Sequence, residues 1–348
     1  MVKIGILGAS GYGGGELIRL LKRHPEVNLV GFSSRRYTGR SLAEAWPQLL
    51  DDRLFRPKEE VVAEAEVIIL ALPNGIAMEL APSLLEAGKR VIDLSGDFRL
   101  PPGVYEAWYG IPHKSPGLYR EAVYGLPELF RPEIPGARLL ANPGCYVTAA
   151  TLALAPLAAE GLLEEALISG MSGVSGAGRE AEETFFAEVN ENLKPYRPGG
   201  THRHIPEMEL NLARLRAQGR WVRTHGPKEE VRLSFIPHLA PMTRGILISA
   251  FVRLREELPE MRLMALYRSF YQDEPFVSFT HALPQTKGTY ASNRVWISLR
   301  KDERMGLVQV FAALDNLGKG MASQAVQNLN LMLGFPEGLA LDREGVWP

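Results

Sequence analysis

The only cysteine in the 348 residues, Cys145, lies in the stretch LANPGCYVTAA. It follows an Asn-Pro-Gly turn and precedes YVTAATLALAPLAA, whose composition and length predict a helix. A thiol at a helix N-terminus has a lowered pKa, because the helix dipole favours the thiolate. Cys145 is therefore a candidate nucleophile. The alternative is a buried structural thiol, since free cysteine packs like a small hydrophobic residue.

A nucleophilic thiol needs a base, and the segment GGTHRHIPEMELNL offers His202 and His204. Pro206 suits the first turn of a helix, and Glu207 in that turn would orient the ring of His204. We expect His204 to be the acid/base and His202 to be the second candidate. A surface or capping role is the alternative for each. No third ligand of suitable spacing is near, so no metal site is expected.

A glycine turn follows the apolar run Val2–Leu7 and opens a helical segment. Gly8, Gly11 and Gly14 give the spacing G-x-x-G-x-x-G, not the usual G-x-G-x-x-G. Glycines in this place let a backbone approach a pyrophosphate, and the helix N-terminus supplies N–H donors. A plain tight turn is the alternative. The cofactor-binding candidates in this turn are Gly8, Ser10, Gly11, Tyr12, Gly13 and Gly14.

The end of the second strand, FSSRRYTGR, has no acidic residue to bind a ribose 2′-hydroxyl. Ser33, Ser34, Arg35 and Arg36 are instead candidates to hold a 2′-phosphate, which favours NADP(H) over NAD. The alternative is that these arginines are solvated surface charge. Leu72 and Pro73, where the third strand ends, are further cofactor candidates. A thiol beside a nicotinamide indicates reduction of an activated acyl group through a thioester.

The elements that must position these residues alternate at first and then change character. Residues 2–7, 27–34, 65–73, 89–98 and 137–144 read as strands separated by helical segments, which predicts a doubly wound, mostly parallel sheet. After about Leu163, longer strands at 167–176, 230–239, 243–254, 275–283 and 293–300 predict a mostly antiparallel sheet with helices on one face.

Two domains follow from this change. Residues 1–145 form the NADP-binding domain, completed by a C-terminal helical segment at 318–348, and residues 146–317 form the catalytic, substrate and oligomerisation domain. We expect the helical pattern at 315–335 to pack back on the first domain. The polar residues 215–230 are expected to form an exposed excursion.

Composition excludes several classes of function. Hydrophobic residues make up 46% and charged residues 23%, as in soluble globular proteins, and the formal net charge is −1. Nucleic acid and membranes are therefore not expected partners. A single cysteine excludes an intrachain disulfide and fits a reducing compartment, so a cytoplasmic location is expected.

Seven motifs occur in order from end to end: GASGYGGGEL, DLSGDFRL, YGLPEL, NPGCYVT, SGVSGAGR, HRHIPE and DNLGKGMASQAVQN. With them the chain resembles the N-acetyl-γ-glutamyl-phosphate reductases of arginine biosynthesis. It equally resembles the related enzymes of lysine biosynthesis, which reduce an α-aminoadipyl phosphate on a small acidic carrier protein. The resemblance implies a Rossmann domain, an α+β domain like that of glyceraldehyde-phosphate dehydrogenase, and a homo-oligomer, either a dimer or a tetramer.

The resemblance also implies roles for individual residues. Cys145 becomes the nucleophile and His204 the better acid/base candidate. The residues expected to hold the phosphate or carboxylate of the substrate are Arg99, Asn142, Arg179 and Arg203. The residues expected on the nicotinamide side are Ser95, Gly173, Gly176, Asn316 and Lys319.

The chain departs from the family pattern at three positions. Val147 replaces the usual Pro of NPGCYPT, a change we expect to affect only the backbone. In TKGTYASN, Thr289 and Ala291 replace the usual Val and Gly, in a segment expected to be a strand near the substrate.

These patterns predict an NADPH-dependent reductase that converts an acyl phosphate to a semialdehyde in amino-acid biosynthesis. A non-catalytic NADP-binding sensor and a cysteine hydrolase are the alternatives. The changes at Thr289 and Ala291, with the basic Lys194, Arg197 and Arg203, favour the carrier-bound aminoadipyl substrate slightly over free N-acetyl-γ-glutamyl phosphate. An upstream kinase is a further conceivable partner.

Overall fold

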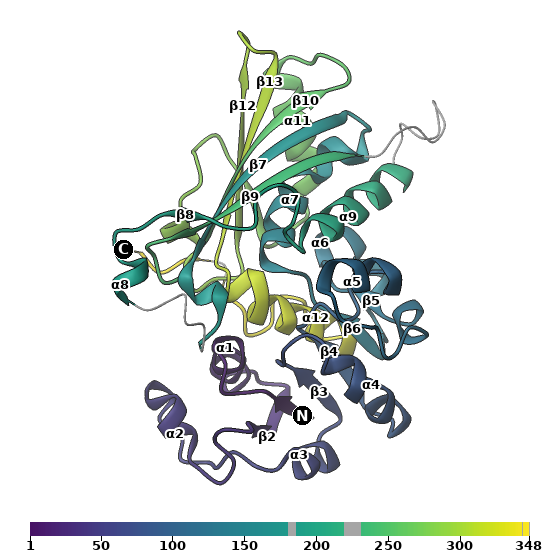
Figure 1. Ribbon diagram of the computed structural model, residues 1–348, viewed down its shortest axis with the longest axis vertical. Helices are drawn as coiled ribbons and strands as arrows, with labels where there is room; N and C mark the ends of the chain where they lie inside the picture. Colours follow the sequence, from purple (N-terminus) through teal and green to yellow (C-terminus); the bar gives the residue numbers. More distant parts are fainter. Residues whose placement is uncertain (180–185, 219–230, 343, 348) are drawn as a thin grey trace. The chain divides into compact units, whose positions relative to one another are not determined.

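The computed structural model describes residues 1–179, 186–218, 231–342 and 344–347. The chain forms two compact units, one made of Met1–Gly144 with Met321–Leu341 and the other of Cys145–Gly320 with the chain from Asp342 onward (Figure 1). The C-terminal residues 318–348, which the sequence analysis assigns together to the first domain, thus divide between the units.

The first unit contains a six-stranded sheet in which all pairings are parallel. Its strands, in spatial order, are β2 (Val27–Ser33), β1 (Val2–Leu7), β3 (Val67–Leu70), β4 (Arg90–Asp93), β6 (Leu139–Ala141) and β5 (Val123–Tyr124). The chain leaves β1 to one side for β2 and returns to the other side for β3. Ligands of open parallel sheets bind beyond the carboxyl ends of strands at such a switch point.

Helices cover both faces of this sheet, as side chains of β3 demonstrate. Val67 and Ile69 belong to one apolar cluster, with residues of α1 (Tyr12–Leu21), α2 (Leu42–Ala45) and α12 (Ser323–Leu333). Ile68 and Leu70 belong to a second cluster, with residues of α3 (Lys58–Glu64), α4 (Ala77–Glu86) and α5 (Pro102–Tyr109). Because successive strand residues point to opposite faces, a continuous apolar run is required here, and the sequence VIIL supplies it.

The remaining elements of the first unit are short. They are helix α6 (Pro127–Phe130) and the 3₁₀ turns Pro47–Leu49, Leu118–Arg120 and Arg131–Glu133.

The second unit contains a seven-stranded mixed sheet. Its order is β11 (Val277–Phe279), β12 (Val295–Asp302), β13 (Leu307–Leu314), β10 (Ile246–Leu254), β7 (Leu163–Gly173), β9 (Arg232–Ala240) and β8 (Lys194–Pro195). The pairs β7–β9 and β11–β12 are parallel, and the other pairs are antiparallel.

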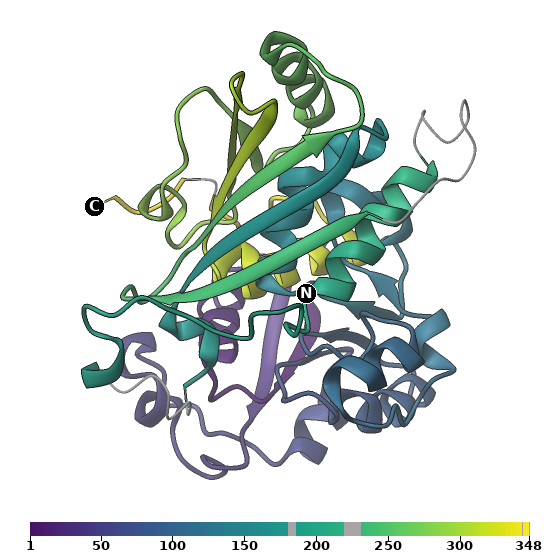
Figure 2. The same cartoon turned by 45° about the horizontal axis from the view of Figure 1, so that its top comes forward.

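One face of this second sheet is covered by helices. The central helix α7 (Cys145–Ala159) packs on β13, β10 and β7, while α9 (Ile205–Gln218) and α11 (Glu260–Tyr271) flank it (Figure 2). Tyr146 to Ala158 of α7 are all buried, which explains why this helix is apolar all round. The unit also contains the short helix α8 (Phe186–Val189) and the 3₁₀ turns Val174–Ala177 and Thr286–Thr289, and the π-helical turn Gly318–Ala322 follows β13.

The other face of the second sheet carries exposed apolar side chains. Leu167 and Phe251 lie opposite each other on β7 and β10 and are 50% and 43% exposed, and Ile236 of β9 is 39% exposed. Their neighbours Ala166 and Ile168 on β7 point to the helical face and are buried. This alternation shows that the face with Leu167, Ile236 and Phe251, here called the open face, exposes three large apolar side chains.

The fold class predicted from the sequence is confirmed, as are the predicted helices after Cys145 and His204. Strand β13 and helix α11 were not predicted. The segment with Thr289 and Ala291, expected to be a strand, is instead a 3₁₀ turn followed by an irregular turn, so that prediction is wrong. Helix α9 includes residues 215–218 of the expected excursion, and residues 219–230 lie outside the described residues.

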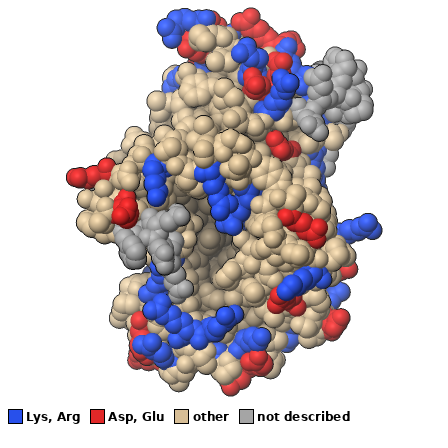
Figure 3. Space-filling view, viewed as in Figure 1, with Lys and Arg blue, Asp and Glu red and all other residues tan. Residues whose placement is uncertain are grey.

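Surface charge fits the balanced composition. On the face in Figure 3, basic and acidic side chains are interspersed, in line with the formal net charge of −1. Among the helices described, none combines the length and apolar character needed to cross a membrane.

Candidate active site

The glycine turn lies at the carboxyl end of β1 and begins α1, and its three spaced glycines have different reasons to be glycine. Gly8 has φ 89°, and a Cβ on it would lie 2.2 Å from the carbonyl oxygen of Ala71. A Cβ on Gly14 would lie 2.5 Å from Cα of Ala9. Both are therefore required by packing.

Gly11 is different, because a Cβ on it would meet only the carbonyl oxygen of Gly8, at 3.9 Å. Its φ of −75° suits any residue, and it stands at the N-cap of α1, where no side chain caps the helix. The fold leaves open space here beside the N–H donors of the first turn. We expect a pyrophosphate to occupy this space, which would account for a glycine that packing does not require.

The end of β2 is joined to the glycine turn. The carbonyl of Ser33 accepts hydrogen bonds from the N–H groups of Gly8 and Ala9 (3.1 and 2.9 Å), and the hydroxyl of Ser34 donates to the hydroxyl of Ser10 (2.8 Å). Arg35 and Arg36 follow directly and are exposed. Ser33 and Ser34 thus contact the glycine turn, and Arg35 and Arg36 follow them in the sequence.

The other predicted cofactor residues of the first unit have structural neighbours. A Cβ on Gly13 would lie 2.3 Å from the sulfur of Met321, and the ring of Tyr12 lies 6.2 Å from that of Trp46. Leu72 and Pro73 follow the carboxyl end of β3 and remain partly or fully exposed.

Ser95 lies in a buried carboxylate cluster after β4. Its hydroxyl donates to Asp93 (2.8 Å), and Asp97 accepts from the N–H groups of Gly75 and Met78. Burial, together with the nearby charge of Asp97, raises the pKa of Asp93 to about 7.

Arg99 and Asn142, both expected to bind substrate, are buried in the first unit. Arg99 donates to the carbonyl of Leu94 (2.7 Å). The amide group of Asn142 donates to the carbonyl of Met321 (3.2 Å) and accepts from Asn328 (3.0 Å). Asn142 therefore fastens the segment after β6 to the start of α12.

A cavity of about 290 Å³ in the second unit brings together the predicted nucleophile and both histidines. Its described lining is Cys145, Tyr146, Ser172, Gly176, Ala177, Lys194, Tyr196, Arg197, His202, Arg203, His204 and Leu239. Cys145 is the first residue of α7 and is half-buried, so the thiol meets both the helix N-terminus and the cavity.

The two histidines occupy different environments. His202 is only 5% exposed, and its Nδ1 accepts a hydrogen bond from the N–H of His204 (3.2 Å), which places the proton of the neutral ring on Nε2. Burial, together with the positive charges of Arg203 and Arg197, lowers the pKa of His202 to about 3. His202 is therefore neutral at neutral pH. The ring of His204 lies 4.8 Å from that of His202 and is half-buried.

The cavity is strongly basic. Lys194, Arg197 and Arg203 line it, and no acidic residue is among its described lining residues. Arginine guanidinium groups bind phosphate and carboxylate in a bidentate way. Arg179, also expected to bind substrate, is exposed and is the last described residue before 180–185. Glu207 is fully buried in the first turn of α9, and its contact with His204 stays a prediction.

Two tyrosines that line the cavity, Tyr146 and Tyr196, were not among the site residues predicted from the sequence. The hydroxyl of Tyr146 donates to the carbonyl of His238 (3.1 Å). Burial, together with the nearby Cys145, raises the pKa of Tyr196 to about 12, so its hydroxyl is protonated at neutral pH. Tyr196 lies in the basic run KPYRPGGTHRH, but nothing in the spacing of that run predicts a role for a tyrosine.

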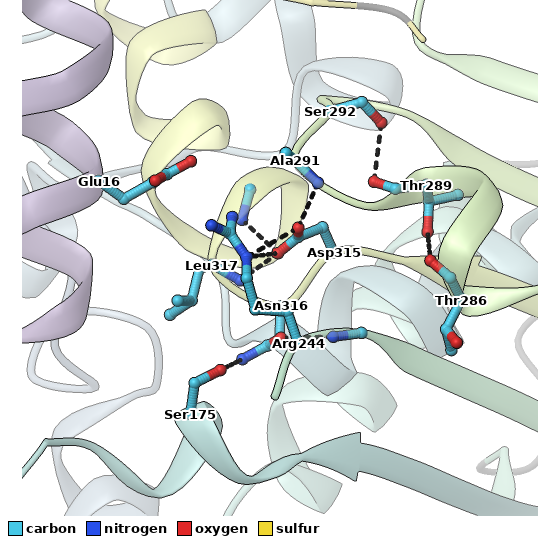
Figure 4. A network of polar contacts seen from close by, with 12 residues as sticks. Glu16, Ser175, Arg244, Thr286, Thr289, Ala291, Ser292, Asp315, Asn316 and Leu317 are labelled. Carbon is cyan, nitrogen blue, oxygen red and sulfur yellow. Dashed lines mark hydrogen bonds and ion pairs between the residues drawn. The ribbon is translucent and has the colours of Figure 1, made fainter. Parts of the chain in front are cut away.

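The residues expected on the nicotinamide side of the second unit are held by a polar network (Figure 4). Asn316 accepts from the N–H of Gly245 (2.8 Å) and donates to the hydroxyl of Ser175 (2.9 Å), which fixes the turn between Gly173 and Gly176. Lys319 is fully buried, with its ammonium 6.0 Å from the ring of Phe276. No group of three or more His, Cys, Asp or Glu side chains suited to a metal occurs among the described residues.

Comparison with known proteins gives the class first. Residues 3–137 match the family described as semialdehyde dehydrogenase, NAD binding domain, and residues 145–316 match semialdehyde dehydrogenase, dimerisation domain. Aspartate semialdehyde dehydrogenase II of Vibrio cholerae has the same fold, with a TM-score of 0.68 at 16% identity over 95% of this chain and 98% of that one. The structure of aspartate semialdehyde dehydrogenase of Candida albicans with NADP has the same TM-score, identity and coverage.

Comparison with curated relatives identifies the family within this class. The N-acetyl-γ-glutamyl-phosphate reductase of Thermus thermophilus is 70% identical over 99% of this chain and all of its own length. That of Symbiobacterium thermophilum is 46% identical over 100% of this chain and 99% of its own length. The chain belongs to the N-acetyl-γ-glutamyl-phosphate reductase family. The predictions of an acyl-phosphate reductase and of NADP(H) as its cofactor are confirmed.

Proposed function

We propose that the substrate is free N-acetyl-γ-glutamyl phosphate, which the enzyme reduces to the semialdehyde of arginine biosynthesis. The observation that carries this proposal is the cavity in which Lys194, Arg197 and Arg203 surround Cys145. The three cations match the phosphate and the carboxylate of a small substrate. The names of the curated relatives support the same substrate.

Two sequence features slightly favoured the carrier-bound aminoadipyl substrate: the changes in the segment TKGTYASN and the basic residues near the predicted site. Neither is now a strong argument for that substrate. Thr289 and Ala291 belong to a turn, and neither is among the described residues that line the cavity. The basic residues line the cavity itself, where a small anionic substrate reaches them directly. A carrier protein is therefore not needed to explain them.

In the proposed reaction, the thiolate of Cys145 attacks the acyl carbon and the phosphate leaves with the bonding electron pair, which gives a thioester. NADPH, when bound, supplies the hydride that reduces this thioester. The resulting hemithioacetal collapses to the aldehyde and returns the electron pair to sulfur. We assign the proton transfers on the substrate oxygen to His204, because His202 is held neutral and its Nδ1 already accepts a hydrogen bond.

The remaining predicted site residues keep their proposed roles. The residues of the glycine turn and of the β2 end bind the cofactor, and Arg203 binds a substrate anion. We also propose that residues 1–145 with 318–348 serve cofactor binding and residues 146–317 serve catalysis and assembly. An NADPH-consuming biosynthetic step and a chain with a single cysteine, which excludes an intrachain disulfide, fit a cytoplasmic enzyme.

The open face supports a homo-oligomer. Leu167, Ile236 and Phe251 form an exposed apolar surface on the sheet of the unit that matches a dimerisation domain. We expect a second copy of the chain to cover this surface. Sedimentation velocity of Phe251→Glu should show dissociation to monomers, whereas Met261→Glu, at an exposed position on α11, should leave the assembly intact. An unchanged Phe251→Glu assembly would place the interface elsewhere.

The substrate assignment is tested by kcat/KM for both acyl phosphates over a salt series, followed by NADPH absorbance. Free N-acetyl-γ-glutamyl phosphate should be turned over efficiently, with the weak salt dependence expected of a small ion. Turnover of the carrier-bound aminoadipyl phosphate alone, with a rate that falls steeply as salt rises, would reverse the assignment.

A further inference from the structure

Asp315 follows β13 directly, and its fully buried carboxylate binds residues from segments that are far apart in the sequence (Figure 4). One of its oxygens accepts from the N–H groups of Leu317 and Gly318 (2.9 and 3.0 Å), and the other accepts from the N–H of Ala291 (2.6 Å). The guanidinium of Arg244 forms an ion pair with it at 2.9 Å. Three segments of the chain thus converge on one carboxylate.

The turn that Asp315 holds packs on the nucleophile. The carbonyl of Asp315 accepts a hydrogen bond from the N–H of Gly320 (2.8 Å). A Cβ on Gly320 would lie 2.8 Å from Cβ of Cys145, so the backbone at Gly320 lies directly against the cysteine. A displacement of this turn would change the space around the thiol.

Ala291 shows that the network holds a strained conformation. Its φ is 58°, a left-handed value that favours glycine, and glycine is usual here in the family. The N–H of Ala291 donates to Asp315, and this bond fixes the residue in place. The buried carboxylate therefore stabilises a turn that the local sequence disfavours.

We propose that Asp315 is a positioning residue, which through the turn at Gly320 sets the orientation of the Cys145 side chain. This inference rests on the proposed role of Cys145. None of the described contacts of this carboxylate is with a residue that lines the cavity. It would therefore act through the backbone of residues 317–320.

Asp315→Asn is the principal test, with Asp97→Asn as the control for loss of a buried carboxylate in the alkylation experiment alone, because Asp97 lies beside Ser95 on the proposed cofactor side. Asp97 is also fully buried and accepts from two backbone N–H groups and the hydroxyl of Tyr105, but it lies in the first unit. Asp315→Asn should lower kcat on the order of 10²-fold, since small displacements of reacting groups have effects of this size. The KM of the acyl phosphate should change less than about threefold, because the basic residues of the cavity remain.

Alkylation by iodoacetamide gives a readout that needs no substrate, and Cys145 is the only cysteine it can modify. Loosening of the covering turn should raise the alkylation rate of Asp315→Asn several-fold above that of Asp97→Asn, which accounts for global unfolding.

Equal alkylation of the two variants, or a folded Asp315→Asn enzyme with normal kcat, would overturn the inference. If Asp315→Asn does not fold, Gly320→Ala decides, because its methyl group would press on Cys145 and should lower kcat. Normal kcat of Gly320→Ala would also overturn it. Activity retained by Cys145→Ser would instead refute the role of the nucleophile, so the two failures are distinguishable.

Discussion

Acidification should destabilise this protein through His202, and the size of the effect follows from its burial. The pKa of His202 lies at about 3 in the folded chain, against an ordinary histidine value of 6.5. Below pH 6.5 the unfolded chain binds a proton at this residue and the folded chain does not. Stability is therefore fully present above pH 6.5 and is lost as the pH falls towards about 3.

At 1.36 kcal/mol per pH unit, His202 should lower the free energy of unfolding by about 2 kcal/mol between pH 6.5 and pH 5. The complete loss near pH 3 would be on the order of 5 kcal/mol. His202→Asn removes the titration, and its amide oxygen can still accept the hydrogen bond that Nδ1 accepts from His204.

The assay is urea denaturation of both proteins at pH 7 and pH 5, followed by circular dichroism. The wild type should lose about 2 kcal/mol more than His202→Asn between these pH values, because contributions of the other histidines cancel in the comparison. Equal losses in the two proteins would refute the reasoning, because they would mean that His202 takes up its proton as readily in the folded chain as in the unfolded one.

Three further predictions concern single positions. Ala291→Gly should raise the free energy of unfolding in urea denaturation by about 0.5–1 kcal/mol, because φ 58° disfavours a residue with a Cβ. The control Ala87→Gly, at φ −74°, should not stabilise the protein, and a less stable Ala291→Gly would contradict the presence of strain. Replacing Arg35 and Arg36 with Ala should weaken NADPH at least about tenfold more than NADH in fluorescence titrations, since a charge-assisted hydrogen bond contributes roughly 1.5–3 kcal/mol; equal weakening would show that they do not bind the 2′-phosphate. Cys145→Ser should bind NADPH normally and lose reduction, because an alcohol is not ionised near neutral pH; near-normal turnover would exclude the thioester.

Local patterns in the sequence were enough to predict the fold class and the candidate nucleophile, Cys145. A glycine turn between an apolar run and a helical segment depends on neighbouring residues, and so does a cysteine at the start of a helix. The same holds for His202 and His204, which precede α9 by few residues. These features are encoded within about fifteen residues of chain, so spacing alone revealed them.

The tertiary structure decided what those residues meet. The low pKa of His202 comes from burial, and Tyr196 reaches the cavity because its N–H pairs with Pro237 of β9, about forty residues away. Asp315 meets Ala291 and Arg244 only because three separate segments end side by side. Such contacts depend on the order and register of the strands, which no local pattern specifies, since packing of the whole sheet against its helices selects them.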